Sequence, residues 1–128
     1  GKKTPADLIE KIKDISVQIG KTPVQVNEAP GFVVNRILIP MINEAIGVWA
    51  DGTADAEGVD TAMQLGAAHP MGPLHLGDLI GLDIVLAIME VIHKETGDAK
   101  YAPQPKLKEL VAAGKLGRKT GEGIFVYK

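Results

Sequence analysis

The hydrophobic residues of this chain recur every three or four positions over most of its length, which is typical of helices that bury one face. A glycine or a proline stands at nearly every boundary of these segments, where such residues commonly start or end a helix. The pattern predicts helices at 5–19, 56–65, 74–80, 82–95 and 106–113. One short segment, 22–27, alternates with period two and predicts a strand, and 124–127 predicts an extended end. The fold is therefore expected to be mainly α.

The longest apolar segment, 28–52, contains a Pro-Gly dipeptide near its start and ends with Asp-Gly. Its apolar residues would cover almost the whole circumference of a helix, which predicts a buried central helix. Pro40 lies inside it and has no N–H for the carbonyl one turn earlier, so we expect a bend there. Asn35 lies close to the bend. It either bonds internally, like most buried amides, or belongs to a site held on the bent helix.

Composition narrows the range of functions. The 128 residues suit one domain, and the net charge of −2 gives no field that would attract nucleic acid or an anionic membrane. No apolar run reaches the roughly 18 residues of a transmembrane helix, so we expect no membrane contact. The chain has no cysteine, which suits a reducing compartment, and we expect a cytoplasmic location. Because it begins with Gly1, we expect it to be a fragment.

The histidines and the basic loop are the first candidates for chemistry. His75 and Asp78 are three apart on one predicted helix and could pair as a base and its orienter, but no nucleophile accompanies them. His69 with this pair does not make a persuasive metal site, because such spacing is common by chance, and we expect no metal. His93 suits the end of a helix. The segment 115–123 is rich in lysine, arginine and glycine, and is either a phosphate contact or a solvated loop.

Three stretches, in order, resemble the 3-hydroxyacyl-CoA dehydrogenases and their 3-hydroxybutyryl-CoA relatives. They are EAPGFVVNRILIPMINEA (28–45), MQLGAAHPMGPLHLGDLIGLD (63–83) and GKLGRKTGEGIFVY (114–127). The resemblance implies that 1–28 is the tail of a missing Rossmann-type dinucleotide-binding domain. It also implies that 29–128 is a substrate-binding and dimerisation domain. This would be a bundle of five to six helices, of the C-terminal type found in 3-hydroxyacyl-CoA and 6-phosphogluconate dehydrogenases.

The same resemblance implies an activity and site residues. The family oxidises L-3-hydroxyacyl-CoA to 3-oxoacyl-CoA with NAD, in fatty-acid or butanoate metabolism. Asn35 matches the asparagine of the family's G-F-x-x-N-R block, which contacts the acyl-CoA substrate near the reacting carbon. An amide can orient a substrate but cannot serve as the base, and no histidine here matches the catalytic one. Lys119 matches a lysine of the G-[KR]-K-T-G block that reaches towards NAD, a cofactor bound mainly by the missing domain.

Two other hypotheses remain. The chain could be a helical association module without active-site residues, or belong to a dehydrogenase of the same group that acts on another hydroxy acid; the P-G-F-V-V-N-R stretch argues against the latter. The association module can be distinguished from the dehydrogenase domain by whether Asn35 faces an open cleft or a closed core. The predicted helix 82–95 carries two apolar stripes, so it packs within its own monomer or against a second subunit in a homodimer. We expect the fragment alone to be inactive.

Overall fold

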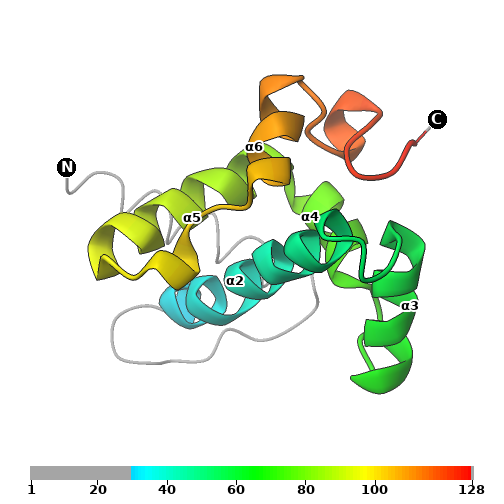
Figure 1. Cartoon of the computed structure of the whole chain (residues 1–128), viewed down its shortest axis with the longest axis horizontal. Coiled ribbons are helices and arrows are strands. Elements are labelled where there is room, and N and C mark those ends of the chain that lie inside the picture. Colours follow the sequence, from blue (N-terminus) through cyan, green and yellow to red (C-terminus); the bar gives the residue numbers. More distant parts are fainter. Residues whose placement is uncertain (1–29, 128) are drawn as a thin grey trace. The chain divides into compact units, whose positions relative to one another are not determined.

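The computed structural model describes residues 30–127, which form five α-helices and two short 3-10 helices (Figure 1). The elements are α2 (Pro30–Ala50), α3 (Ala56–Gly66), α4 (Pro73–Ile80), α5 (Leu82–Thr96), η1 (Ala99–Tyr101), α6 (Pro105–Ala112) and η2 (Arg118–Thr120). Within 30–127 the only β pairing is two isolated bridges, Gly117 with Glu122 and Glu122 with Val126. The mainly α prediction is confirmed. The predicted helix and strand at 5–19 and 22–27 lie outside the described residues.

Local sequence signals explain where these helices begin and end. The carboxylate of Asp55 accepts the Gly58 N–H at 2.7 Å and caps the start of α3. Pro73 occupies the first turn of α4, where a missing N–H leaves no helical bond unmade. Gly97 ends α5 with φ 66°, a left-handed conformation that glycine adopts without steric strain. The predicted bounds of these helices therefore agree with the structure within one or two residues.

Helix α2 continues through Pro40, so the proline does not end it. Two compact units meet within this helix: one ends at Ile39 and the other begins at Pro40. By length and composition alone, the stretch Phe32–Ala50 could cross a membrane, but the core helix of a globular unit satisfies the same criterion. In the second unit Asn43 ties α2 to a loop by two hydrogen bonds, as expected for a core helix.

The prediction that α2 is buried on all sides is wrong. Three large apolar side chains near its start are exposed: Phe32, Val33 and Ile37, by 46, 40 and 66%. The buried positions instead recur with helical spacing along one stripe. They are Asn35, Ile39, Ile42, Asn43, Ala45 and Ile46. Apolar residues on every side of a helix therefore do not mean that every side is buried. A helix in a small domain buries mainly the face that packs against the core.

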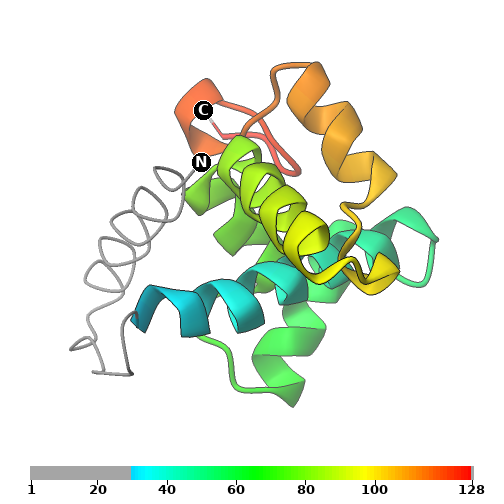
Figure 2. The same cartoon turned by 90° about the vertical axis from the view of Figure 1, so that its left-hand side faces the viewer.

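The core of the unit from Pro40 onward is formed around α5, which packs against both α4 and α6, and includes side chains from the second half of α2 (Figures 1 and 2). Its fully buried side chains are Ile42, Ile46, Leu74, Leu82, Val85, Ile88, Met89 and Leu107. Gly77 lets α4 approach the second half of α2, because an added Cβ would lie 3.1 Å from Ile42 Cγ2. Of the two apolar stripes on α5, one contributes Val85 and the other Ile88, so both reach the core of this single chain.

Two further features differ from what the sequence pattern predicts. Helical spacing predicts that Val59, Ala62, Met63 and Leu65 face inward from α3, but Ala62 and Leu65 are exposed, Leu65 by 83%. The buried positions of α3 are Val59 and Asp60 in its first half, and the helix continues past them. The polar sequence 98–105, which contains two prolines, predicts only a connection after α5, yet it forms η1 and buries Tyr101. One aromatic side chain was enough to anchor this turn to α5.

Candidate functional site

Asn35 is buried on α2, in the unit that ends at Ile39. The residue is 6% exposed. Its Oδ1 is buried and has no hydrogen-bond partner in the part of the chain that the structure describes. A buried acceptor without a donor costs about 1–3 kcal/mol, so such groups are rare and require an explanation. Asn35 is therefore buried, and its oxygen has no bond to any of the described residues.

Asn43 occupies the same buried stripe of α2 and has a different environment. Its Nδ2 donates to the Ala102 carbonyl oxygen at 3.1 Å, and its Oδ1 accepts the Gln104 N–H at 2.9 Å. Both ends of the amide are thus used to fasten the connection before α6. Gln104 is the residue just before Pro105, so Asn43 also fixes where α6 begins. This amide has the role expected of an ordinary buried asparagine.

Lys119, the residue predicted to contact the cofactor, lies in η2 and forms an ion pair with Asp83. Its Nζ is 2.7 Å from Asp83 Oδ1, and the two side chains are 45 and 40% exposed. Burial acts to raise the pKa of the Asp83 carboxyl, but the hydrogen bond and charge of Lys119 outweigh it and lower that pKa. Gly81 leaves room for the pair, because a Cβ there would lie 2.9 Å from Lys119 Nζ. The ammonium is therefore held near the start of α5 and remains accessible.

The loop that carries Lys119 is closed by its own hydrogen bonds. Gly117 N–H donates to the Glu122 carbonyl at 3.0 Å. Thr120 Oγ1 accepts the Leu116 N–H at 3.0 Å and lies 2.9 Å from the Glu122 carbonyl oxygen. The neighbouring Leu116 carbonyl accepts the N–H of Leu82, the first residue of α5, at 2.8 Å. The basic glycine-rich loop is thus an ordered structure joined to α5.

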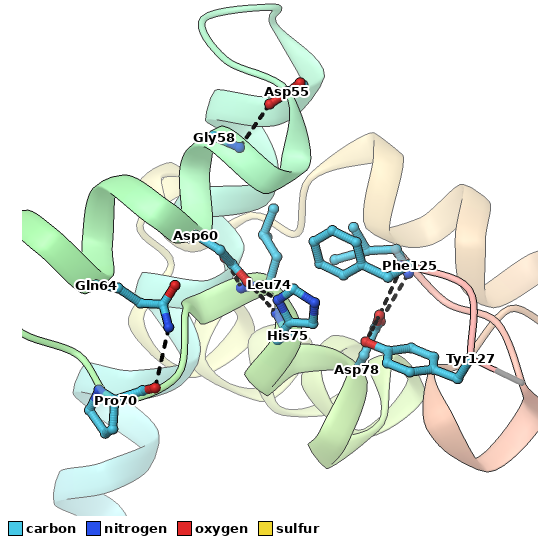
Figure 3. Close-up of polar contacts among 11 residues, drawn as sticks. Asp55, Gly58, Asp60, Gln64, Pro70, Leu74, His75, Asp78, Phe125 and Tyr127 are labelled. Atoms are coloured by element: carbon cyan, nitrogen blue, oxygen red, sulfur yellow. Dashed lines mark hydrogen bonds and ion pairs between the residues drawn. The ribbon is translucent and has the colours of Figure 1, made fainter.

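Asp78, on α4, holds the segment that follows this loop (Figure 3). The residue is 1% exposed. Its Oδ1 accepts the Ile124 N–H at 2.9 Å, and its Oδ2 accepts the Phe125 N–H at 3.0 Å and the Tyr127 hydroxyl at 2.7 Å. Burial, followed by the bond to this carboxylate, raises the pKa of Tyr127. The last residues of the chain are therefore fixed to α4 by one buried carboxylate.

A second buried carboxylate, Asp60 of α3, binds the start of α4. It accepts the N–H groups of Leu74 and His75, both at 2.8 Å, and lies 2.6 Å from His75 Nδ1. The His75 ring also stacks on Phe125 with ring centroids 3.8 Å apart (Figure 3). The suggested pairing of His75 with Asp78 is therefore wrong. These side chains leave α4 in different directions, and each finds a partner from another part of the chain.

The remaining candidate groups do not add a catalytic centre within residues 30–127. No cluster of three metal-ligating side chains occurs among these residues. His93 lies in the last turn of α5, as predicted. One pocket of about 530 Å³ opens between the end of α2 and the start of α6. It is lined by Glu44, Gly47, Ala50, Asp51, Gln104, Pro105, Lys106 and Glu109, and by neither of the predicted site residues.

Comparison with solved structures places this architecture among dehydrogenases. The structure of the (S)-3-hydroxybutyryl-CoA dehydrogenase PaaH1 from Ralstonia eutropha matches with a TM-score of 0.78 and 55% identity, over 91% of this chain and 41% of that one. The protein-family model for the C-terminal domain of 3-hydroxyacyl-CoA dehydrogenases matches residues 31–127 of the sequence. The chain belongs to this family.

Full-length relatives carry the same description. A 3-hydroxybutyryl-CoA dehydrogenase of Clostridioides difficile is 58% identical over 127 residues, which are 99% of this chain and 45% of that protein. The human mitochondrial hydroxyacyl-coenzyme A dehydrogenase is 44% identical over 126 residues, 98% of this chain and 40% of that protein. The chain therefore spans less than half the length of these relatives, and it corresponds to one part of an oxidoreductase.

Sequence reasoning missed the roles of two buried carboxylates. Asp60 drew no attention, and Asp78 was considered only with the wrong partner. In the structure each carboxylate lies against a glycine, and a Cβ on that glycine would overlap it: Asp60 at Gly72 and Asp78 at Gly123. The two glycines are the only trace of these contacts in the sequence. Which glycine meets which carboxylate depends on long-range packing, so a single sequence does not reveal it.

Proposed function

We propose that residues 29–128 are the substrate-binding and dimerisation domain of an NAD-dependent L-3-hydroxyacyl-CoA dehydrogenase. Residues 1–28 would complete the dinucleotide-binding domain that precedes it. The parent protein would oxidise a 3-hydroxyacyl-CoA to the 3-oxoacyl-CoA in fatty-acid or butanoate metabolism, in the cytoplasm. The names of the relatives and the family of this chain support the proposal. A short acyl chain is favoured by the 3-hydroxybutyryl-CoA relatives.

The observation that most supports a role for this chain's own residues is the oxygen of Asn35, which has no partner among the described residues. Asn35 Oδ1 is buried and has no partner among the described residues, so in the parent's substrate complex it would accept a hydrogen bond from the substrate's hydroxyl, while the adjacent Nδ2 would donate to an acyl oxygen. Asn35 cannot take a proton at neutral pH, so its role is to hold the reacting carbon in place. The group that removes the hydroxyl proton must come from outside this chain.

Lys119 fits a contact with a dinucleotide but does not make a binding site alone. Its ammonium is accessible, and its present partner Asp83 is an exposed carboxylate that a phosphate oxygen can replace or join. NAD, when bound, supplies the acceptor for the hydride. The part of this chain that binds it would be Lys119 and the loop around it, with most contacts made by the preceding domain.

A homodimer is part of the same proposal. Phe32, Val33 and Ile37 form exposed apolar surface on α2, and Leu65 and Leu79 add apolar side chains on two other helices. Single exposed apolar residues are ordinary, but those of α2 lie within two turns of one helix. Association of the parent chains would cover part of this surface. Sedimentation equilibrium of the parent protein at micromolar concentration should give a mass near that of two parent chains. A mass of one parent chain would contradict the homodimer.

The proposed activity has a direct test. The full-length parent should reduce NAD in the presence of 3-hydroxybutyryl-CoA at an ordinary enzymatic rate, about 1–10³ per second. The 128-residue chain, mixed with the same substrates, should show no turnover. Absorbance of the reduced nicotinamide measures both. A parent that oxidises only another hydroxy acid would contradict the substrate assignment, and turnover by the short chain would contradict the division of roles.

A further inference from the structure

Both ends of the loop that carries Lys119 lie against a single residue, Asp78. At one end, Gly117 lies so close that an added Cβ would overlap the Asp78 carbonyl oxygen. At the other end, a Cβ on Gly123 would overlap Asp78 Oδ1 and lie 2.6 Å from Gly117 Cα. Gly117 has φ 125°, so a side chain would also be strained there. The five residues between these glycines therefore project from a base that is formed around Asp78.

Both oxygens of the Asp78 carboxylate are bonded in this arrangement. It accepts three hydrogen bonds, from Ile124, Phe125 and Tyr127, immediately after the loop. Asp78 makes no ion pair among the described residues, so backbone and hydroxyl donors balance its buried charge there. Such charge-assisted bonds are stronger and shorter than neutral ones. Asp78 is therefore a rigid anchor for the segment that leaves the loop.

Lys119 does not touch Asp78, and its own ion pair is exposed. Exposed ion pairs hold a lysine weakly, at about 0–1 kcal/mol. The position of the ammonium is thus determined chiefly by the loop backbone, which depends on the base around Asp78. We propose that Asp78 is the positioning residue for Lys119 in its contact with the dinucleotide. This inference rests on the proposed function of Lys119.

An asparagine at position 78 would test this without changing the size of the side chain. Oδ1 now faces the Ile124 N–H, and Oδ2 faces the Phe125 N–H. Whichever way the amide is turned, its NH₂ meets one of these two donors, so one backbone N–H loses its acceptor. Asp78→Asn should therefore loosen the segment at the end of the loop.

The matched control is Asp60→Asn. Asp60 is also buried and also accepts two backbone N–H groups, those of Leu74 and His75, but these lie at the start of α4 and not beside the loop. The reference for complete loss of the contact is Lys119→Ala. All variants are made in the full-length parent. The dissociation constant for NADH is measured by calorimetry, together with the melting temperature and the kinetic constants.

We expect Lys119→Ala and Asp78→Asn each to weaken NADH binding about tenfold, the factor that corresponds to losing one charge-assisted contact. Asp60→Asn should lower the melting temperature similarly and leave NADH affinity unchanged. Adding Asp78→Asn to Lys119→Ala should cause no further weakening, because both changes remove one interaction. The KM for NAD should rise in Asp78→Asn while kcat changes little.

Two results would overturn the inference, and they differ. If Lys119→Ala weakens NADH binding but a folded Asp78→Asn does not, Asp78 is only structural and the role of Lys119 stands. If Lys119→Ala leaves NADH affinity unchanged, the proposed cofactor contact itself fails, and the inference fails with it. Should Asp78→Asn not fold, Tyr127→Phe removes one of the three bonds and keeps the backbone donors paired. It should weaken NADH binding about two- to threefold, and an unchanged affinity would count against Asp78.

Discussion

Buried polar residues are hydrogen-bonded in the unit from Pro40 onward, whereas a buried amide oxygen in the first half of α2 has no partner among the described residues. In the former, Asn43, Asp60 and Asp78 are at most 3% exposed, and each bonds two or three groups from another part of the chain. In the latter, Asn35 is 6% exposed and its oxygen bonds nothing in the described residues. The two asparagines lie on one helix, and the main difference between them is that only Asn43 has a bonded oxygen among the described residues.

We propose that this difference separates polar groups that support the fold from one that binds the substrate. A buried polar group that is fully bonded stabilises one packing arrangement, and removing it leaves its partners unpaired. A buried acceptor without a partner makes no such contribution and is retained at a cost in free energy. We therefore expect substitutions of the first kind to lower stability and substitution of Asn35 to lower activity.

The largest effect on stability is expected for Asp60→Ala. The change removes the acceptor of the Leu74 and His75 N–H groups and the partner of the His75 ring, so we expect a loss of about 3–5 kcal/mol, because two backbone donors lose a charged acceptor. The control is Asp55→Ala, which removes one exposed cap bond to Gly58 and should cost about 1 kcal/mol. Urea unfolding measures both. Equal losses would show that burial of Asp60 is unimportant.

Asn43→Ala should have the next largest effect. It leaves the Ala102 carbonyl and the Gln104 N–H without their partner, which should lower the free energy of unfolding by about 2–3 kcal/mol. Gln64→Ala is the matched control, because Gln64 is also an amide but makes one exposed bond of 3.3 Å to Pro70. That change should stay within about 0.5 kcal/mol. If Asn43→Ala is as mild as the control, the contrast between the two asparagines disappears.

A smaller effect is expected for Tyr127→Phe, which removes one of three bonds to Asp78 and should cost about 1 kcal/mol near neutral pH. Burial and the Asp78 carboxylate raise the pKa of Tyr127 above its ordinary value of 10.0. The folded state therefore keeps the proton when the unfolded state begins to lose it. The stabilisation is fully present below pH 10.0 and declines as the pH rises above it. Unfolding of both proteins at several pH values should show the difference shrinking only in that alkaline range.

The sequence predicted the helices well because their signals are local. Asp55, Pro73 and Gly97 act on their own turn of helix, so their effects can be inferred from neighbouring residues. The exposure of Leu65 and the partners of Asp60 depend on which elements meet in space, and no local pattern encodes that. Asn35 was singled out by resemblance to a family, whereas its unpaired oxygen became evident only from the structure.

The measurement closest to the central claim is the kinetics and stability of Asn35→Ala in the full-length parent. Its oxygen makes no bond within the described chain, so we expect a change in stability of less than about 1 kcal/mol. The value of kcat/KM for 3-hydroxybutyryl-CoA should fall roughly 10²-fold, as when a positioning contact is lost, and NAD affinity should stay the same. An Asn35→Ala enzyme that melts early and turns over normally would show that Asn35 supports the fold, as Asn43 does, and would contradict this account.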